Sequence, residues 1–334
     1  MKLHHLAIAA VAAVSGQAYA ADLQPNDAAF KLYVSGSSAI APVLAGIFTQ
    51  NCGADLVQYK SQAAAFGDSA DGASHNVYVC TVTGSDFGAA YVGKVVAVWK
   101  RDAAGSAQGI FPVATNTPIT FLDTTTCTSR VCTGTISVAP DAGISDLETS
   151  QFNTDYNRPA AFTGQTTATS DFGSTQPVAA IVFGLIVNNR LYTQLQTDQA
   201  TSGIPTVSSA AFYSLYSAGW NNKGWGPVTR TNPTNQVNIC SRAVGSGTRA
   251  TAQIQFTQLP NNIFATEFAA PSSNTPGATR GGNLANAIFI SEESSSGNVV
   301  SCVESAETGF VCSRSSVLMM TDDGIDDVSS SNTS

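Results

Sequence analysis

Positive charge is scarce in this chain of 334 residues. Lysine and arginine total 15 against 23 acidic residues, so the net charge is −8, and the cations are scattered along the sequence. A nucleic-acid-binding surface needs a basic patch, so this composition argues against a nucleic-acid partner. A small anion remains a suitable ligand, because it needs only local hydrogen bonds and one or two cations.

Histidine is also scarce, which argues against the common hydrolytic mechanisms. Two of the three histidines stand among the first five residues, and His75 lies in a polar, glycine-rich stretch where we expect a loop. Ser-His-Asp and Cys-His catalysis need an imidazole beside the nucleophile. The sequence also lacks a Gly-x-Ser-x-Gly elbow and a Walker-type phosphate loop. We therefore predict no enzymatic activity and no catalytic residues, with a carboxylate-based mechanism left open.

No apolar run beyond the first twenty residues is long enough to span a membrane. The longest, Val178 to Val187, predicts a buried strand instead. Residues 1–20 combine Lys2, an apolar run and the small-x-small motif Ala18-Tyr19-Ala20, which is typical of a signal peptide cleaved after Ala20. The mature chain is therefore expected in the periplasm or outside the cell, without insertion into the membrane.

The seven cysteines include no Cys-x-x-Cys pair, so we predict no metal site and no cofactor. Cysteines in an exported chain favour disulfides. Proximity along the sequence suggests three pairs and leaves Cys240 unpaired: Cys52–Cys80, Cys127–Cys132 and Cys302–Cys312. Sequence alone does not fix this connectivity.

Three short segments carry the strongest functional signal. The first loop, residues 36–39 (Gly-Ser-Ser-Ala), lies between a predicted strand and a predicted helix from Ala41 to Gln50. The second loop, residues 143–146, ends in Ser145-Asp146. The third loop, residues 242–248, places Arg242 four residues before the glycine-flanked Ser246. Backbone N–H groups, hydroxyls and a forked cation on such loops suit one small oxyanion.

Together the three loops resemble those of the phosphate-binding proteins of bacterial ABC transporters, two-lobed periplasmic receptors that close on hydrogen phosphate. The family pattern Arg-Ala-x-Gly-Ser-Gly-Thr is matched throughout the third loop, and the pattern Gly-x-Ser-Asp is matched in the second. The first loop departs at Ala39, where the family usually has threonine or phenylalanine. The resemblance implies eight phosphate ligands: Ser37, Ser38, Ala39, Asp146, Arg242, Ser246, Gly247 and Thr248.

Three features depart from the family. Its further serine donor has only a weak counterpart, Ser61. An insertion of about residues 64–137 precedes the second loop, and within it Asp86 to Tyr91 imitates that loop with tyrosine in place of the aspartate. The segment after the third loop is shorter than the family's and ends in an acidic, serine-rich tail.

The resemblance and the alternation of strand and helix patterns predict an α/β fold of the type II periplasmic-binding-protein kind. Each of two lobes would hold a mixed sheet flanked by helices, with a β-rich insertion in the first lobe. The expected boundaries are a signal peptide at 1–20, a first lobe at 21–176, a second lobe at 177–265, and a divergent or truncated C-terminal segment at 266–334. A further helix is expected from Asn189 to Asp198.

The expected function is capture of inorganic phosphate for an ABC-type uptake system, with an inner-membrane permease as partner. In this interpretation Asp146 accepts a hydrogen bond from the proton that hydrogen phosphate carries, and it excludes sulfate, which carries no proton at neutral pH. Two alternatives remain open. One is a secreted or surface protein that keeps the scaffold for adhesion or partner binding; the other, weaker, is a phosphatase on the same scaffold.

Overall fold

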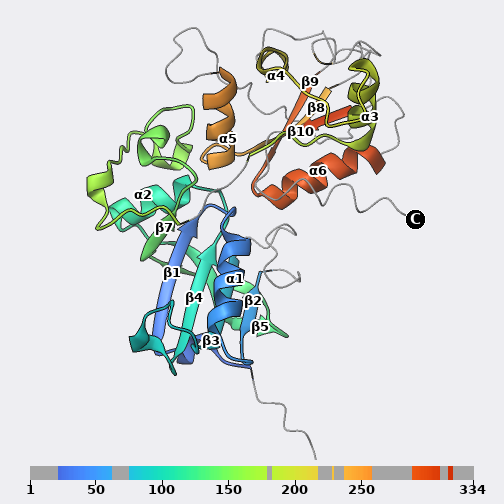
Figure 1. The fold of residues 1–334 in the computed structure, drawn as a ribbon. Coiled ribbons are helices and arrows are strands. Elements are labelled where there is room, and N and C mark those ends of the chain that lie inside the picture. The colour runs from blue at the N-terminus through green and yellow to red at the C-terminus, as the bar shows by residue number, and fades with distance from the viewer. Residues whose placement is uncertain are drawn as a thin grey trace, which may run out of the picture.

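A computed structural model describes residues 22–61, 75–178, 183–216, 228, 237–257, 288–308 and 315–318. It has two sheets with helices packed against them (Figure 1). The predicted α/β class is therefore confirmed. The expected signal peptide lies outside the described residues.

The first sheet has seven strands in the order β5-β6-β2-β3-β4-β1-β7. β1 pairs in parallel with β4 and β7, whereas β3 is antiparallel to both β2 and β4, so the sheet is mixed. The strands are β1 (Phe30–Gly36), β2 (Val57–Lys60), β3 (His75–Thr81), β4 (Val95–Arg101), β5 (Ile119–Thr128), β6 (Val131–Val138) and β7 (Ala142–Ile144). The segment expected to be an insertion thus supplies β3, β4, β5 and most of β6, and β4 lies between β3 and β1 inside the sheet.

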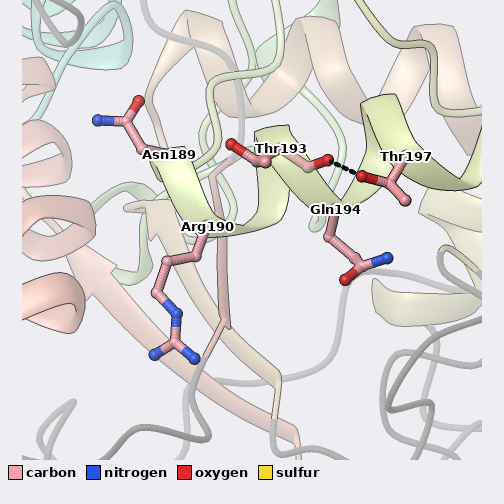
Figure 2. Close-up of a pocket in the computed structure, with 5 residues that line it drawn as sticks. All are labelled: Asn189, Arg190, Thr193, Gln194 and Thr197. Atoms are coloured by element: carbon pink, nitrogen blue, oxygen red, sulfur yellow. Dashed lines mark hydrogen bonds between the residues drawn. The ribbon is translucent and has the colours of Figure 1, made fainter.

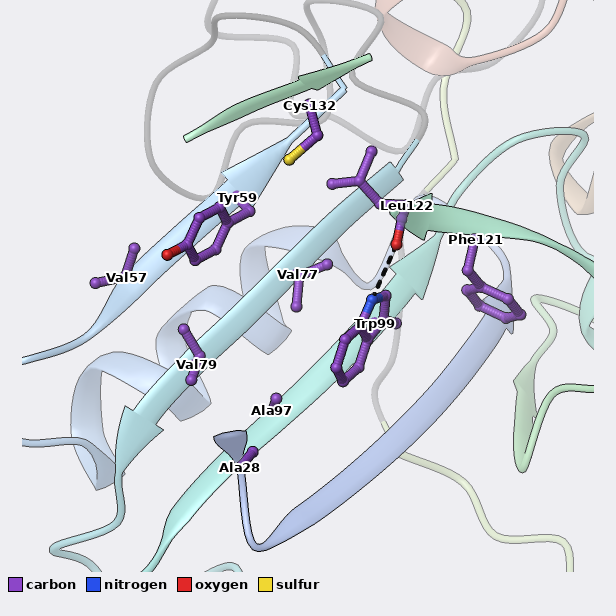
Figure 3. Close-up of a cluster of buried hydrophobic side chains, with 10 residues drawn as sticks. All are labelled: Ala28, Val57, Tyr59, Val77, Val79, Ala97, Trp99, Phe121, Leu122 and Cys132. Atoms are coloured by element: carbon purple, nitrogen blue, oxygen red, sulfur yellow. Dashed lines mark hydrogen bonds between the residues drawn. The ribbon is translucent and has the colours of Figure 1, made fainter. Parts of the chain in front are cut away.

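Alternation along β3 and β4 divides the core of this sheet between its two faces. Val77, Val79 and Trp99 point into one apolar cluster, which Figure 3 shows with the Trp99 indole donating to the Leu122 carbonyl at 3.1 Å. Tyr78 points to the opposite face. There it stacks on Phe48 of helix α1 (Ala41–Asn51), with ring centroids 5.0 Å apart. The predicted helix 41–50 is therefore confirmed, and its buried side covers one face of the sheet.

The second sheet joins three parallel strands in the order β10-β8-β9. They are β8 (Val237–Arg242), β9 (Ile288–Glu293) and β10 (Ser315–Leu318). β9 and β10 lie beyond residue 265, so the expected C-terminal segment contributes two strands to this sheet. All described strands of the second sheet run in parallel, where a mixed sheet was expected.

The other helices include α2, which contacts β7 and β1 of the first sheet, and α6, which packs on β8 of the second. The helix predicted from Asn189 to Asp198 is found with those bounds as α3. The helices after α1 are α2 (Ala107–Thr115), α3 (Asn189–Asp198), α4 (Ser209–Tyr216), α5 (Gly247–Ala252) and α6 (Ser296–Thr308). Short helical turns occupy Pro25–Asp27, Ala89–Tyr91, Thr149–Phe152, Ala160–Phe162, Thr169–Asp171 and Gln253–Thr257.

Among the described residues, three disulfides join neighbouring elements. Cys52–Cys80 and Cys127–Cys132 confirm two of the predicted pairs. The third bond is Cys240–Cys302, so the predicted pair Cys302–Cys312 and the unpaired Cys240 are wrong. The reason is tertiary: α6 packs on β8 and brings the two Cα atoms within 6.0 Å, although 62 residues separate them in sequence. Three disulfides fit a chain that folds in an oxidising compartment.

Among the described residues, no helix has the length and apolar character needed to cross a bilayer.

His75 was expected in a loop but begins β3, directly opposite Arg101 of β4. Burial lowers the pKa of His75 to about 4, and the nearby positive charge of Arg101 adds to this effect. The imidazole is therefore neutral in the folded protein at pH values where an unfolded chain would protonate it.

This burial predicts a loss of stability in mild acid. Between pH 6.5 and pH 4 the unfolded state binds the His75 proton and the folded state does not, so the free energy of unfolding falls as the pH falls. The expected loss is about 1.5 kcal/mol at pH 5.5 and about 3 kcal/mol at pH 4. Urea unfolding of wild type and His75→Gln across this range measures it. Equal pH slopes in the two proteins would rule out His75 as the source.

Candidate functional site

The first loop leaves β1 through a sharp turn at Gly36. Its φ of +114° lies in the region that favours glycine, and an added Cβ would collide with the Ile144 carbonyl. Ser37 N–H donates to that same carbonyl at 3.0 Å, so the first loop is held against the end of β7. Ser38 is 2% exposed, and its buried hydroxyl has no hydrogen-bond partner within the described ranges.

The backbone of Ala39 makes a contact within the first loop itself. Its N–H, expected to bind the anion, donates to Ser37 Oγ at 3.1 Å. The Ala39 N–H thus has a partner within the first loop, whereas the Ser38 hydroxyl has none among the described residues.

The second loop follows β7 and carries Asp146. The Asp146 Oδ2 atom accepts a hydrogen bond from Ser106 Oγ at 2.9 Å, and Asp146 N–H donates back to Ser106 Oγ at 3.3 Å. Ser106 is fully buried and immediately precedes α2. Ser145 turns away from this pair, since its hydroxyl donates to the Leu147 carbonyl at 2.6 Å.

The third loop connects the end of β8 to the start of α5. Arg242, the last residue of β8, is 2% exposed and donates through Nη1 to Ser296 Oγ at 2.7 Å. Arg249 Nη1 donates to the Arg242 carbonyl at 3.2 Å. Ser246 and Thr248 are 2% and 1% exposed, and their buried hydroxyls have no hydrogen-bond partner in the part of the chain that the structure describes.

The second and third loops meet at α2 (Figure 1 shows α5 near α2). Ala107 N–H, at the start of α2, donates to the Gly245 carbonyl at 2.9 Å. A side chain on Gly247 would collide with the Asp146 carboxylate and reach within 2.5 Å of Ser106 Oγ, so glycine permits this close approach. Together with the bond from Ser37 to Ile144, these contacts link all three loops in one connected region.

Ser106 is the residue of this region that the sequence analysis missed. It lies within the predicted insertion, whereas the sequence offers Ser61 as a weak candidate for the further serine donor. Ser61 contacts His75 instead. The Ser61 N–H donates to the His75 carbonyl at 3.0 Å, and the His75 N–H donates to Ser61 Oγ at 3.4 Å. The position of Ser106 before an apolar helical stretch can be found from the sequence, but its hydrogen bond to Asp146, 40 residues away, cannot.

The segment Asp86 to Tyr91, which imitates the second loop, has a structural role. Asp86 Oδ2 accepts from the amide of Asn51 at 3.0 Å, which ties the end of α1 to the loop after β3. The Tyr91 ring packs on Phe30 with centroids 4.8 Å apart.

A surface depression lies elsewhere, along α3 (Figure 2). Its lining comes from one helix face: Asn189, Arg190, Thr193, Gln194 and Thr197. Thr197 Oγ1 donates to the Thr193 carbonyl at 2.9 Å, as hydroxyls on helices often do. None of the predicted ligands lines this depression, and we assign it no function.

Comparison with known proteins identifies no relative. The chain matches no protein-family model, no curated protein and no solved structure. The three loops are therefore the features of the chain that indicate a function.

Proposed function

We propose that the chain is an exported binding protein for hydrogen phosphate that delivers its ligand to an ABC-type permease. The observation that carries the proposal is that three hydroxyls on the first and third loops are buried without a hydrogen-bond partner among the described residues. They are the hydroxyls of Ser38, Ser246 and Thr248, which are at most 2% exposed. Burying such a group without a partner costs about 1–3 kcal/mol, so three of them on ligand-type loops favour a polar ligand.

The positive charge at the start of the third loop favours an oxyanion as that ligand. Arg242 supplies a guanidinium that stays protonated at any physiological pH. Hydroxyls and an arginine fork both donate hydrogen bonds to phosphoryl oxygens. A few charge-assisted bonds of about 1.5–3 kcal/mol each suffice for the roughly −8 kcal/mol of micromolar binding.

Asp146 supplies selectivity in this proposal. An ionised carboxylate only accepts hydrogen bonds, so it pairs with a ligand that still carries a proton. Hydrogen phosphate has one at neutral pH and sulfate has none. Two facing acceptors in a buried site would cost several kcal/mol, which selects against sulfate. The bond from Ser106 Oγ fixes the orientation of the carboxylate through its Oδ2 atom.

The hydroxyls give a test that separates ligand binding from folding. Thr248→Val keeps the shape of the side chain and removes a hydroxyl that has no hydrogen-bond partner among the described residues. We expect phosphate affinity to fall about fivefold, while the ligand-free protein keeps or gains up to about 1 kcal/mol of stability. Calorimetry and urea unfolding measure the two effects.

The matched control is Thr175→Val, which removes a hydroxyl from an exposed position. It should leave both quantities unchanged. The proposal fails if Thr248→Val destabilises the ligand-free protein and leaves phosphate affinity as in wild type, because the hydroxyl would then serve the fold alone.

A further inference from the structure

A buried lysine lies directly behind the first loop. Lys100, in β4, is 1% exposed, and its ammonium donates to the carbonyl of Ser37 at 2.9 Å and to that of Gly36 at 3.2 Å. It also donates to the Arg101 carbonyl at 3.2 Å and forms an ion pair with Asp102 at 2.6 Å. Two of its four partners are thus backbone oxygens of the segment that carries the predicted phosphate ligands.

A chain of buried amides supports this lysine from the neighbouring strands. Asp102 accepts through Oδ2 from the Asn76 amide at 3.1 Å, and Asn76 Oδ1 accepts from the Gln58 amide at 3.1 Å. Every member of the chain is at most 6% exposed. The support therefore runs through β2, β3 and β4 to the turn at the end of β1.

Burying this ion pair carries a desolvation cost that the attraction between the two charges often only balances. Replacing a buried ion pair with uncharged residues of similar size is often neutral or stabilising, so a buried pair is weak evidence for a purely structural role. Here the ammonium holds two loop carbonyls by direct hydrogen bonds. A carbonyl oxygen turned toward the ligand would repel an anion, because both carry negative charge.

We propose that Lys100, held by Asp102, is a positioning residue for the anion-binding loop after β1. It binds the carbonyls of Gly36 and Ser37 and so fixes the backbone that carries the Ser38 hydroxyl. The expected effect of Lys100 on phosphate affinity rests on the proposed function. Its expected effect on the backbone of residues 36–38 does not.

The test is the double substitution Lys100→Met with Asp102→Asn. The lysine substitution alone would leave the Asp102 charge buried without its partner, so the pair is neutralised together. We expect a folded protein in which the amides of residues 37–40 exchange hydrogen at least tenfold faster and those of β3 exchange as in wild type. Phosphate affinity is expected to fall at least tenfold. Lys31→Met, which removes an exposed lysine bonded to the Asn26 carbonyl, is the matched control.

A folded double variant with wild-type exchange in residues 37–40 overturns the inference. If the double variant does not fold, Asp102→Asn alone carries the same test, with a smaller local acceleration expected and wild-type exchange again as the contrary result. Exchange is measured without ligand. Wild-type protein that fails to bind phosphate would therefore defeat the proposed function, while the exchange data still decide the role of Lys100.

Discussion

Replacing Arg242 with glutamine is expected to weaken phosphate binding about a hundredfold, which corresponds to about 3 kcal/mol. The substitution removes the guanidinium of the third loop and the charge-assisted hydrogen bonds that we propose it makes to the anion. Folding should survive, because the Cys240–Cys302 disulfide holds β8 two residues away. Calorimetric titration with phosphate measures the loss.

Two further variants sharpen this prediction. Arg242→Lys keeps the charge but not the planar fork, so we expect an intermediate loss of about tenfold. Arg190→Gln removes the same charge from an exposed position on α3 and should leave binding unchanged. An Arg242→Gln protein that is folded and binds phosphate within twofold of wild type would remove Arg242 from the site.

Asp146→Asn is expected to change which anion binds. The asparagine amide can donate a hydrogen bond, so the variant should accept sulfate, and the selectivity for phosphate over sulfate should fall about a hundredfold. Competition between the two anions in calorimetry measures the ratio of affinities. Asp27→Asn, at an exposed position, is the control for the loss of one negative charge. Undiminished selectivity in Asp146→Asn would show that another group discriminates between the anions.

Local sequence patterns were sufficient to predict the elements whose structure depends on residues close together in the chain. The bounds of α3 follow from a capping residue and a helical repeat: Asn188 Oδ1 accepts from Leu191 N–H at 3.0 Å, and Leu191 and Leu195 are buried one turn apart. The hairpin disulfide Cys127–Cys132 was predictable for the same reason, since its two cysteines face each other across adjacent strands.

Features set by packing between distant segments could not be predicted in this way. Nothing in residues 95–101 shows that β4 pairs with both β3 and β1, since strand order depends on tertiary contacts. Cys240 and Cys302 meet only because α6 covers β8. Ser106 was overlooked because its partner, Asp146, is 40 residues away. The three loops could be located from sequence motifs. The contacts that support them, above all those of Lys100, could not be predicted in this way.

The central claim is tested most directly by calorimetric titration of residues 21–334 with phosphate, with sulfate as the comparison. We predict binding of phosphate at micromolar concentration or tighter, and no detectable binding of sulfate. A folded protein that gives no heat with either anion, or that binds both equally, would contradict a hydrogen-phosphate site built from these three loops.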